Sequence, residues 1–253
     1  MTNREKLEYL TKYLLKERKM PEELPDNEQE LFLLYRSLVN TRLPAPIDDE
    51  YLRTEEEYLR SAAVNKGITD VSSLQPREPH IFLWHGDITT LRCGAIVNAA
   101  NSGMTGCYSP CHSCIDNCIH TFAGVRLRNK CDEIMREQGH EEPTGSSKIT
   151  PAYDLPCKYV IHTVGPIVHG ALDDEHCRLL RSCYESCLDT AVKNDVGSIA
   201  FCCISTGVFG FPQDKAAEIA VDTVRKFVRT HDLDVVFNVF TETDFMIYDR
   251  LLS

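Results

Sequence analysis

Metal-binding side chains are concentrated in residues 106–120, where fifteen residues hold four cysteines, two histidines and one aspartate. Cys107, His112 and Cys114 form the pattern C-x4-H-x-C, which offers two thiolates and one imidazole, the ligands that Zn²⁺ prefers in tetrahedral sites. Three protein ligands leave one coordination position open. A zinc ion with an open position acidifies a bound water or polarises a substrate oxygen, so the pattern predicts a zinc site that does chemistry.

Two other interpretations of this segment stay open. The four cysteines are spaced by four, three and four residues, so they could line one helix face as small core residues or together close a structural zinc site: Cys107, Cys111, Cys114 and Cys118. Pro110 opposes a continuous helix, because Ser109–Pro110 is typical of a helix cap and its first position. If a predicted ligand is wrong, Cys111 and Cys118 are the substitutes.

A glycine-containing loop, residues 204–212, follows an apolar run and precedes a helix-like segment. Gly207 and Gly210 let backbone N–H groups turn inward, and the N-terminus of the next helix adds positive potential, so the loop could hold a diphosphate. An ordinary turn is the alternative. Phe209 and Phe211 either stack on a sugar or base or cover the core.

Other polar residues also follow apolar runs. Asp87 in Gly86–Thr89 could accept hydrogen bonds from the exocyclic amine of a base, or it could cap a helix. The amides in Asn98–Gly103 either stabilise a turn or bind hydroxyl groups. We assign His120 and His162 to packing or to hydrogen bonding behind the ligands.

The elements that must position these residues alternate between short apolar runs and amphipathic stretches. The runs are Ile81–His85, Ala95–Val97, Tyr159–His162, Ser198–Ile204 and Val235–Phe240, and the amphipathic stretches lie near 115–139, 173–194 and 213–231. This alternation predicts an α/β layered domain whose strands are buried on both faces. Ligands of such sheets bind beyond the carboxyl ends of the strands, so loops 86–90, 98–114, 163–172 and 205–212 are the informative ones.

Residues 1–75 carry no catalytic constellation and are predicted to form a helical extension of a domain spanning residues 76–253. The chain is expected to be helical to about Leu74, with helices that begin near Thr2 or Asn3, near Asp26, and at Asp48 or Asp49. Apolar stripes at helical spacing are packing surfaces, so the extension is expected to pack on the main domain.

Composition narrows the classes of function. The net charge of −11 argues against a general nucleic-acid binder, which needs a basic face. No apolar run reaches the roughly 20 residues of a membrane span, and the charged start differs from a signal peptide. We therefore expect a cytoplasmic protein whose 12 cysteines stay reduced.

Four motifs in order, Gly86–Thr89, Ala95–Asn101, Val160–Pro166 and Ser205–Pro212, resemble the motif series of macrodomains, which are ADP-ribose-binding modules. The resemblance spans about Pro79 to Leu252. It implies a three-layer α/β/α sandwich with a mixed six-stranded sheet and ADP-ribose lying across the crest of the strands.

The loop after Asn101 departs from hydrolytic macrodomains of the MacroD type, which have a run of glycines and then Val-Asp-Gly-x-Ile-His. Here a longer loop holds Cys107, His112 and Cys114, and only Ile115–His120 keeps the later shape. This departure resembles the zinc-containing macrodomains of microbial origin, which carry a helical N-terminal extension and remove mono-ADP-ribose from proteins. In some bacteria these are partnered with a sirtuin-like ADP-ribosyltransferase and a lipoylated carrier protein.

The resemblance also implies roles for individual residues. Asp87 binds the adenine amine with the Ile88 backbone beside it, Asn101 orients the distal ribose, and Asp116 corresponds to the aspartate of the MacroD-type motif. The metal ligands are Cys107, His112 and Cys114. The loop that wraps the diphosphate consists of Ser205, Thr206, Gly207, Val208 and Phe209, with Phe209 flanking the distal ribose.

The resemblance implies a zinc-dependent protein mono-ADP-ribosyl hydrolase with Asn101 and Asp116 as its catalytic residues and Asp- or Glu-linked ADP-ribose as the first candidate substrate. The sequence does not rank an acidic linkage against a serine or arginine linkage. Zinc could activate water or position the ribose, and the sequence favours neither. A non-catalytic ADP-ribose reader, a macrodomain whose zinc only ties down the loop, and an O-acetyl-ADP-ribose deacetylase remain as alternatives.

Overall fold

Three helices form the N-terminal extension of the computed structural model, which describes residues 1–253. Their bounds are Asn3–Glu17 for α1, Glu28–Asn40 for α2 and Asp49–Lys66 for α3. Thr2 and Glu5 make a reciprocal capping box at α1, and Asn27 and Asp48 cap the other two helices. The predicted starts are therefore confirmed to within one or two residues.

The helical prediction is wrong for the last residues before Leu74. Helix α3 ends at Lys66, and its C-cap is Gly67, whose φ of 91° is a conformation that glycine adopts without strain. Strand β1, Thr69–Asp70, and a 3₁₀ turn, Val71–Ser73, follow it, and β1 pairs with β4, Leu91–Arg92. The extension is thus tied to the main domain by a backbone ladder as well as by side chains.

The main sheet has seven strands rather than the six expected. Its order is β2-β3-β9-β8-β5-β7-β6. The bounds are Pro76–Glu78 for β2, Ile81–His85 for β3, Asp234–Val239 for β9, Ser198–Phe201 for β8, Ala95–Ala100 for β5, Tyr159–Val164 for β7 and Ser147–Pro151 for β6. The five inner strands are parallel, and the two edge strands, β2 and β6, are antiparallel to their neighbours. The short edge strand β2 accounts for the additional strand.

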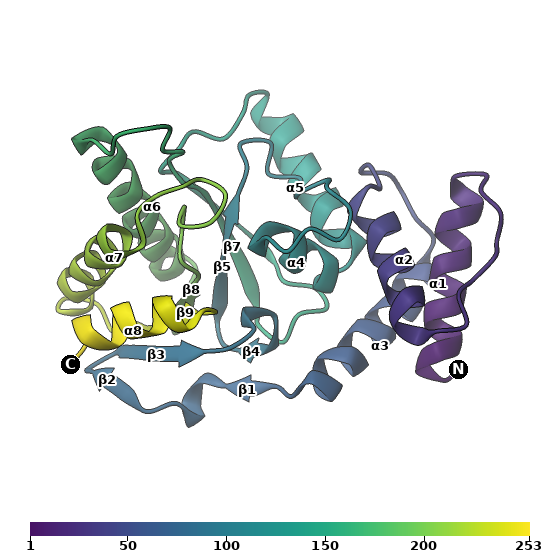
Figure 1. The fold of residues 1–253 in the computed structure, drawn as a ribbon, viewed down its shortest axis with the longest axis horizontal. Coiled ribbons are helices and arrows are strands. Elements are labelled where there is room, and N and C mark those ends of the chain that lie inside the picture. Colours follow the sequence, from purple (N-terminus) through teal and green to yellow (C-terminus); the bar gives the residue numbers. More distant parts are fainter.

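Helices cover both faces of this mixed sheet. The helices are α4 (Ile115–Phe122), α5 (Val125–Gln138), α6 (Asp174–Lys193), α7 (Gln213–Val228) and α8 (Glu242–Leu251). Figure 1 shows α6, α7 and α8 on one side of the sheet and α4 and α5 on the other, with α1–α3 beyond α4. The three-layer α/β/α prediction is confirmed. The amphipathic stretch 115–139 is two helices, because the chain turns at Gly124 with a φ of 78°.

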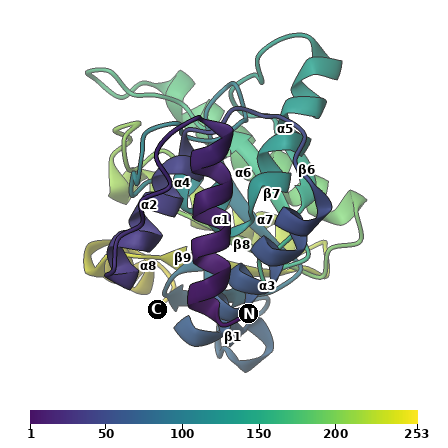
Figure 2. The same cartoon turned by 90° about the vertical axis from the view of Figure 1, so that its right-hand side faces the viewer.

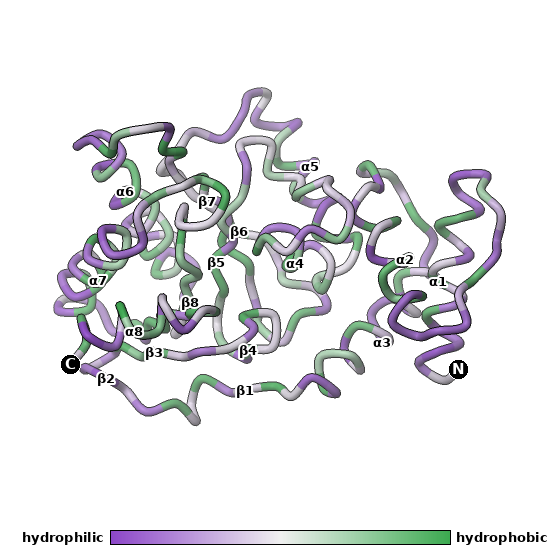
Figure 3. Tube along the Cα trace, viewed as in Figure 1, coloured by the Kyte–Doolittle hydropathy of each residue, from purple (hydrophilic) through white to green (hydrophobic).

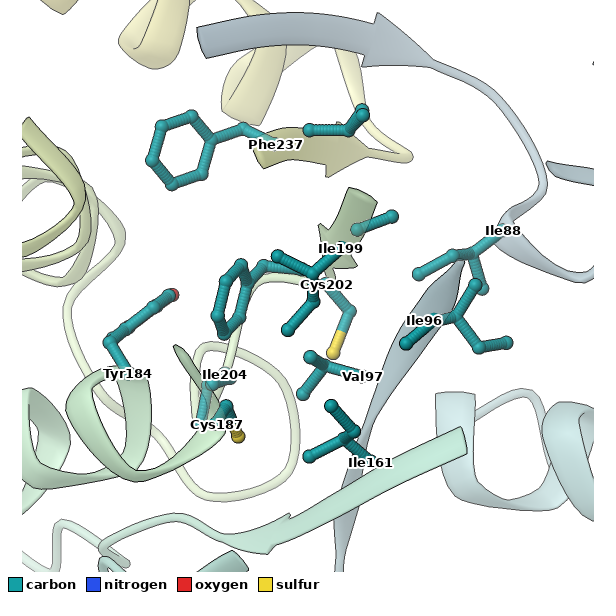
Figure 4. Packing of buried hydrophobic residues seen from close by; sticks show 14 of the residues in the cluster. Ile88, Ile96, Val97, Ile161, Tyr184, Cys187, Ile199, Cys202, Ile204 and Phe237 are labelled. Atoms are coloured by element: carbon teal, nitrogen blue, oxygen red, sulfur yellow. The ribbon is translucent and has the colours of Figure 1, made fainter. Parts of the chain in front are cut away.

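The apolar side chains form two clusters. The larger one lies between the sheet and its helices, and in Figure 4 the sulfur of Cys202 is surrounded by aliphatic side chains such as Val97 and Ile199. Figure 3 shows hydrophilic and hydrophobic residues alternating along α7, as expected of a helix with one buried face. The smaller cluster holds α1–α3 together and also takes in Val125 of α5, and Figure 2 shows α1 on the outside of this bundle. No helix is both long and apolar enough to cross a membrane.

Candidate functional site

The predicted site residues gather at one edge of the sheet, because they follow the carboxyl ends of parallel strands. Asp87 follows β3, Asn101 follows β5, and Ser205 lies four residues after β8. In a sheet of parallel strands these ends meet on the same side. Residues 101–114, the connection from β5 to α4, are called the metal loop below.

The metal loop brings the three predicted zinc ligands together. The ligand atoms of Cys107, His112 and Cys114 all lie within 4.8 Å of one another, and Cys107 Sγ is 3.8 Å from His112 Nδ1. Two ligands at the usual Zn–S and Zn–N lengths of a tetrahedral site are about 3.6 Å apart, so this donor set fits zinc. All three residues are half-buried, which leaves one side of the cluster accessible.

The two substitute cysteines do not join this cluster. Cys111 Sγ donates to the carbonyl of Leu33 at 3.4 Å, and Cys118 Sγ lies 3.5 Å from Arg36 Nη2. The prediction that Ser109–Pro110 begins a helix is wrong. Helix α4 begins at Ile115, and its cap is Cys114, whose sulfur accepts from a backbone N–H.

Asp116 lies in the first turn of α4 and is hydrogen-bonded to two side-chain amides, that of Asn98 in β5 and that of Asn101 directly after it. Asn98 Nδ2 donates to Asp116 Oδ1 at 2.8 Å, and Asn101 Nδ2 donates to Asp116 Oδ2 at 3.2 Å. Asn101 Nδ2 also donates to the carbonyl of Gly106 in the metal loop at 3.1 Å. Burial raises the pKa of Asp116 to about 6, against the lowering effect of these hydrogen bonds.

The two histidines lie behind Asp116. His162 is bonded through Nε2 to Thr150 Oγ1 at 2.9 Å, and its Nδ1 is 3.2 Å from Asn98 Nδ2, as the prediction of hydrogen bonding required. His120 Nε2 is 3.6 Å from Asp116 Oδ1, and neither of its nitrogens has a hydrogen-bond partner. Burial lowers the pKa of both imidazoles, to about 3 for His162, so both are neutral at pH 7.

The loop after β8 presents unpaired backbone donors. The N–H groups of Gly207, Val208 and Phe209 donate to no protein acceptor, whereas those of Thr206, Gly210 and Phe211 are paired within the molecule: their partners are Cys203, Gly207 and Ser205. Helix α7 follows with no side chain capping its N-terminus. Three adjacent free amides and a helix N-terminus form the kind of site that binds a phosphate group.

Asp87 fills the capping role that the sequence left open, and its contact with a base stays a prediction. Its Oδ1 accepts from the backbone N–H of Thr89 at 3.0 Å and from Thr89 Oγ1 at 2.6 Å, which caps the 3₁₀ turn Ile88–Thr90. Its Oδ2 receives only Lys66 Nζ, at 3.2 Å. Burial tends to raise the pKa of Asp87, but the hydrogen bonds from Thr89 and the charge of Lys66 outweigh it and lower the pKa.

The aromatic residues divide between core and surface. Phe211 is only 1% exposed and packs in the main core, while Phe209 is half-buried in the loop. Phe240, which the sequence reading missed, is 74% exposed directly after β9, and its carbonyl accepts from His85 Nε2 at 3.0 Å. The sequence contained one indication of it: the apolar run 235–240 extends one residue past the end of β9, to the edge of the sheet where Asp87 lies.

Three comparisons with known proteins agree with this geometry. Residues 97–220 match the model of the Macro domain family. A protein-ADP-ribose hydrolase of Treponema medium is 54% identical over the whole of both chains, and one of Staphylococcus aureus strain MSSA476 is 47% identical over this whole chain and 97% of its own. The Trypanosoma brucei macrodomain crystallised with ADP-ribose is 31% identical, covers 86% of this chain with 95% of its own length, and superposes with a TM-score of 0.68. The chain therefore belongs to the macrodomain family, alongside these protein-ADP-ribose hydrolases.

Proposed function

We propose that this macrodomain enzyme hydrolyses mono-ADP-ribose from modified protein side chains with the help of zinc, and that its substrates are Asp- or Glu-linked. The full-length similarity to protein-ADP-ribose hydrolases supports the reaction. The arrangement of the metal loop supports the zinc. The observation that carries the proposal is that Asn101 donates both to Asp116 and to the metal loop, so the metal ligands and the carboxylate belong to one site.

We propose one orientation for the substrate along this edge of the sheet. Asp87 Oδ2 is the acceptor for the adenine amine, the free amides of Gly207, Val208 and Phe209 bind the diphosphate, and the distal ribose reaches Asn101. The exposed ring of Phe240 offers a face on which the adenine stacks. In the proposed orientation the C1″ atom of the distal ribose lies near Asn101, which is bonded to Asp116 and to the carbonyl of Gly106.

The residues of the site divide the chemistry between them. Cys107, His112 and Cys114 would hold the zinc ion, which when bound supplies a Lewis acid for a water or a ribose hydroxyl. Asn101 fixes the ribose through its amide. Asp116 accepts a proton from the attacking water.

The inferred linkage follows from the leaving group. A carboxylate side chain leaves as a stable anion and needs no strong general acid, whereas a serine alkoxide or an arginine guanidine needs a proton. Next to Asn101, the residue proposed to hold the distal ribose, lie one carboxyl group, Asp116, and behind it one neutral buried imidazole, His120. The site is therefore better equipped to activate water than to protonate a basic leaving group.

Metal analysis and ADP-ribose release test the proposal together. We expect the native chain to bind about one zinc ion. Cys107→Ala should bind no zinc and lose turnover by about 100-fold or more. Asn101→Ala should keep its zinc but lose turnover. Cys177→Ala, a half-buried cysteine on α6, is the matched control. Full release by metal-free Cys107→Ala would refute zinc catalysis, and ADP-ribose binding without release by the native chain would make the protein a reader. Release of acetate from O-acetyl-ADP-ribose alone would make it a deacetylase.

A hydrolase of this kind requires an enzyme that attaches ADP-ribose. The motif resemblance leads us to propose a sirtuin-like ADP-ribosyltransferase and a lipoylated carrier protein as partners in the same pathway. Release of ADP-ribose from a carrier modified by such a transferase, compared with release from an automodified transferase, would test this assignment.

A further inference from the structure

The N-terminal extension reaches the metal loop through one arginine on α2. Arg36 is half-buried, and its Nη2 donates to the carbonyl of His112 at 2.7 Å and to Asn117 Oδ1 at 2.9 Å, and lies 3.5 Å from Cys118 Sγ. One guanidinium nitrogen thus bridges a predicted metal ligand and the helix that follows the loop.

Asn117, which Arg36 contacts, is itself hydrogen-bonded to the other two predicted ligand residues. It is fully buried in the first turn of α4, and its Nδ2 donates to the carbonyls of Cys107 at 3.3 Å and Ser109 at 2.9 Å. Its backbone N–H donates to Cys114 Sγ at 3.4 Å. Because Arg36 occupies Asn117 Oδ1, the amide is held with its NH₂ group toward the loop.

A second contact from α2 supports the tip of the loop. Asn40 Oδ1 accepts from the backbone N–H of Cys111 at 2.9 Å, and Asn40 Nδ2 donates to Thr121 at 2.9 Å. Cys111 has a φ of 54°, a left-handed conformation that costs energy in a residue other than glycine. The contact with Asn40 helps to hold that conformation.

We propose that Arg36 and Asn117 are positioning residues for the zinc site, so that the helical extension is a working part of the metal centre. This inference rests on the proposed function and specifies what α2 contributes to it. Every one of the three ligand residues is touched by this pair: His112 by Arg36, and Cys107 and Cys114 by Asn117.

Zinc affinity of full-length variants tests the role. Zinc dissociation constants would be measured by competition with a chromogenic chelator, well below each variant's melting temperature. We expect Arg36→Met to weaken zinc binding by about 10- to 100-fold, the usual range for residues that orient metal ligands. Arg36→Lys, which keeps the charge and one donor, should restore part of that loss. Asn117→Asp keeps the acceptor for Arg36 but loses both amide donors, and should weaken zinc binding to a similar extent.

Two further measurements separate positioning from general stability. The visible absorption spectrum of the Co²⁺-substituted protein reports ligand geometry, and it should change in Arg36→Met but not in Arg178→Met, an exposed arginine on α6 paired with Glu175. Binding of ADP-ribose should stay within about twofold in both variants. Zinc affinity and a Co²⁺ spectrum equal to those of the native chain in Arg36→Met would overturn the inference. A native chain that binds no zinc would overturn the proposed function and, with it, the role assigned to this pair.

Discussion

At the scale of single residues, Asp87 stabilises the fold with one carboxylate oxygen and keeps the other for the proposed contact with adenine. One carboxylate oxygen is consumed by capping a 3₁₀ turn through Thr89, and the other faces Lys66 at the accessible edge of the sheet. The turn fixes the direction of the second oxygen, so its hydrogen bond to a ligand loses little entropy. We therefore expect Asp87 to favour ligands whose base carries an exocyclic amine, as adenine does.

We predict that Asp87→Ala weakens ADP-ribose binding by about 10- to 100-fold, because a hydrogen bond to a charged group contributes about 1.5–3 kcal/mol. Isothermal titration with ADP-ribose measures the loss, and ribose 5-phosphate, which has no base, should bind both proteins equally. Lys66→Met, which removes the ion-pair partner but keeps the carboxylate, is the control. An equal loss of affinity for both ligands would show that Asp87 acts only on the turn.

The sequence pointed to the candidate zinc ligands but not to the residues that hydrogen-bond to them. Cys107, His112 and Cys114 could be picked out because their types and spacing are those of zinc ligands. The contacts of Arg36 with His112 and Asn117 join residues 76 and 81 positions apart, and no local pattern predicts such a pairing. The sequence did not mark Phe240 as a candidate contact for adenine, because in the sequence it is simply the last residue of an apolar run that predicts a buried strand.

At the scale of elements, the apolar runs predicted all five inner strands, because strands buried on both faces are hydrophobic throughout. Edge strand β6 (Ser147–Pro151) was missed, since it is half-buried and contains serine, lysine and threonine. The start of α4 was misplaced, because Ser109–Pro110 is a stronger capping signal than the cysteine that does the capping. The loop from β8 to α7 has three unpaired backbone donors, and its role as an anion site stays a prediction.

Removal of one backbone donor tests that loop. Val208 is 77% exposed and its N–H is unpaired, so Val208→Pro deletes a donor without removing a core side chain. We expect ADP-ribose affinity to fall by about 10-fold or more, in keeping with a lost hydrogen bond to a charged group. Adenosine, which lacks phosphate, should bind as it does to the native chain. Val208→Ala, which keeps the N–H, is the matched control, and equal affinities of the alanine and proline variants for ADP-ribose would contradict a role for this donor.

At the scale of the whole molecule, the extension and the main domain meet at a buried cluster of acidic groups. Glu55 of α3 accepts from Tyr35, Tyr51 and the backbone N–H of Val125. Asp154, in the loop between β6 and β7, accepts from Arg126 at 2.5 Å through Oδ1, while its Oδ2 has no partner. A Cβ added to Gly124 would lie 2.5 Å from Asp154 Oδ2 and 2.7 Å from Glu55 Oε2, so the two carboxyl groups border the same small space.

We expect this cluster to make the stability of the contact between the extension and the main domain depend on pH. Burial and the charge of Glu55 raise the pKa of Asp154 from 3.8 to about 7, although Arg126 opposes the shift, and burial also raises the pKa of Glu55. Between about pH 4 and pH 7 the folded protein therefore keeps a proton on Asp154 that the unfolded chain has lost. The free energy of unfolding must then fall as pH rises through this window, by about 1–3 kcal/mol from this group.

Asp154→Asn should remove that part of the pH dependence, because the amide stays neutral at every pH. Urea unfolding at pH 5, 6, 7 and 8 would show a steeper loss of stability in the native chain than in the variant. Asp249→Asn, which alters a surface ion pair with Arg77, should leave the native slope unchanged. Parallel curves for the native chain and Asp154→Asn would place the titration elsewhere.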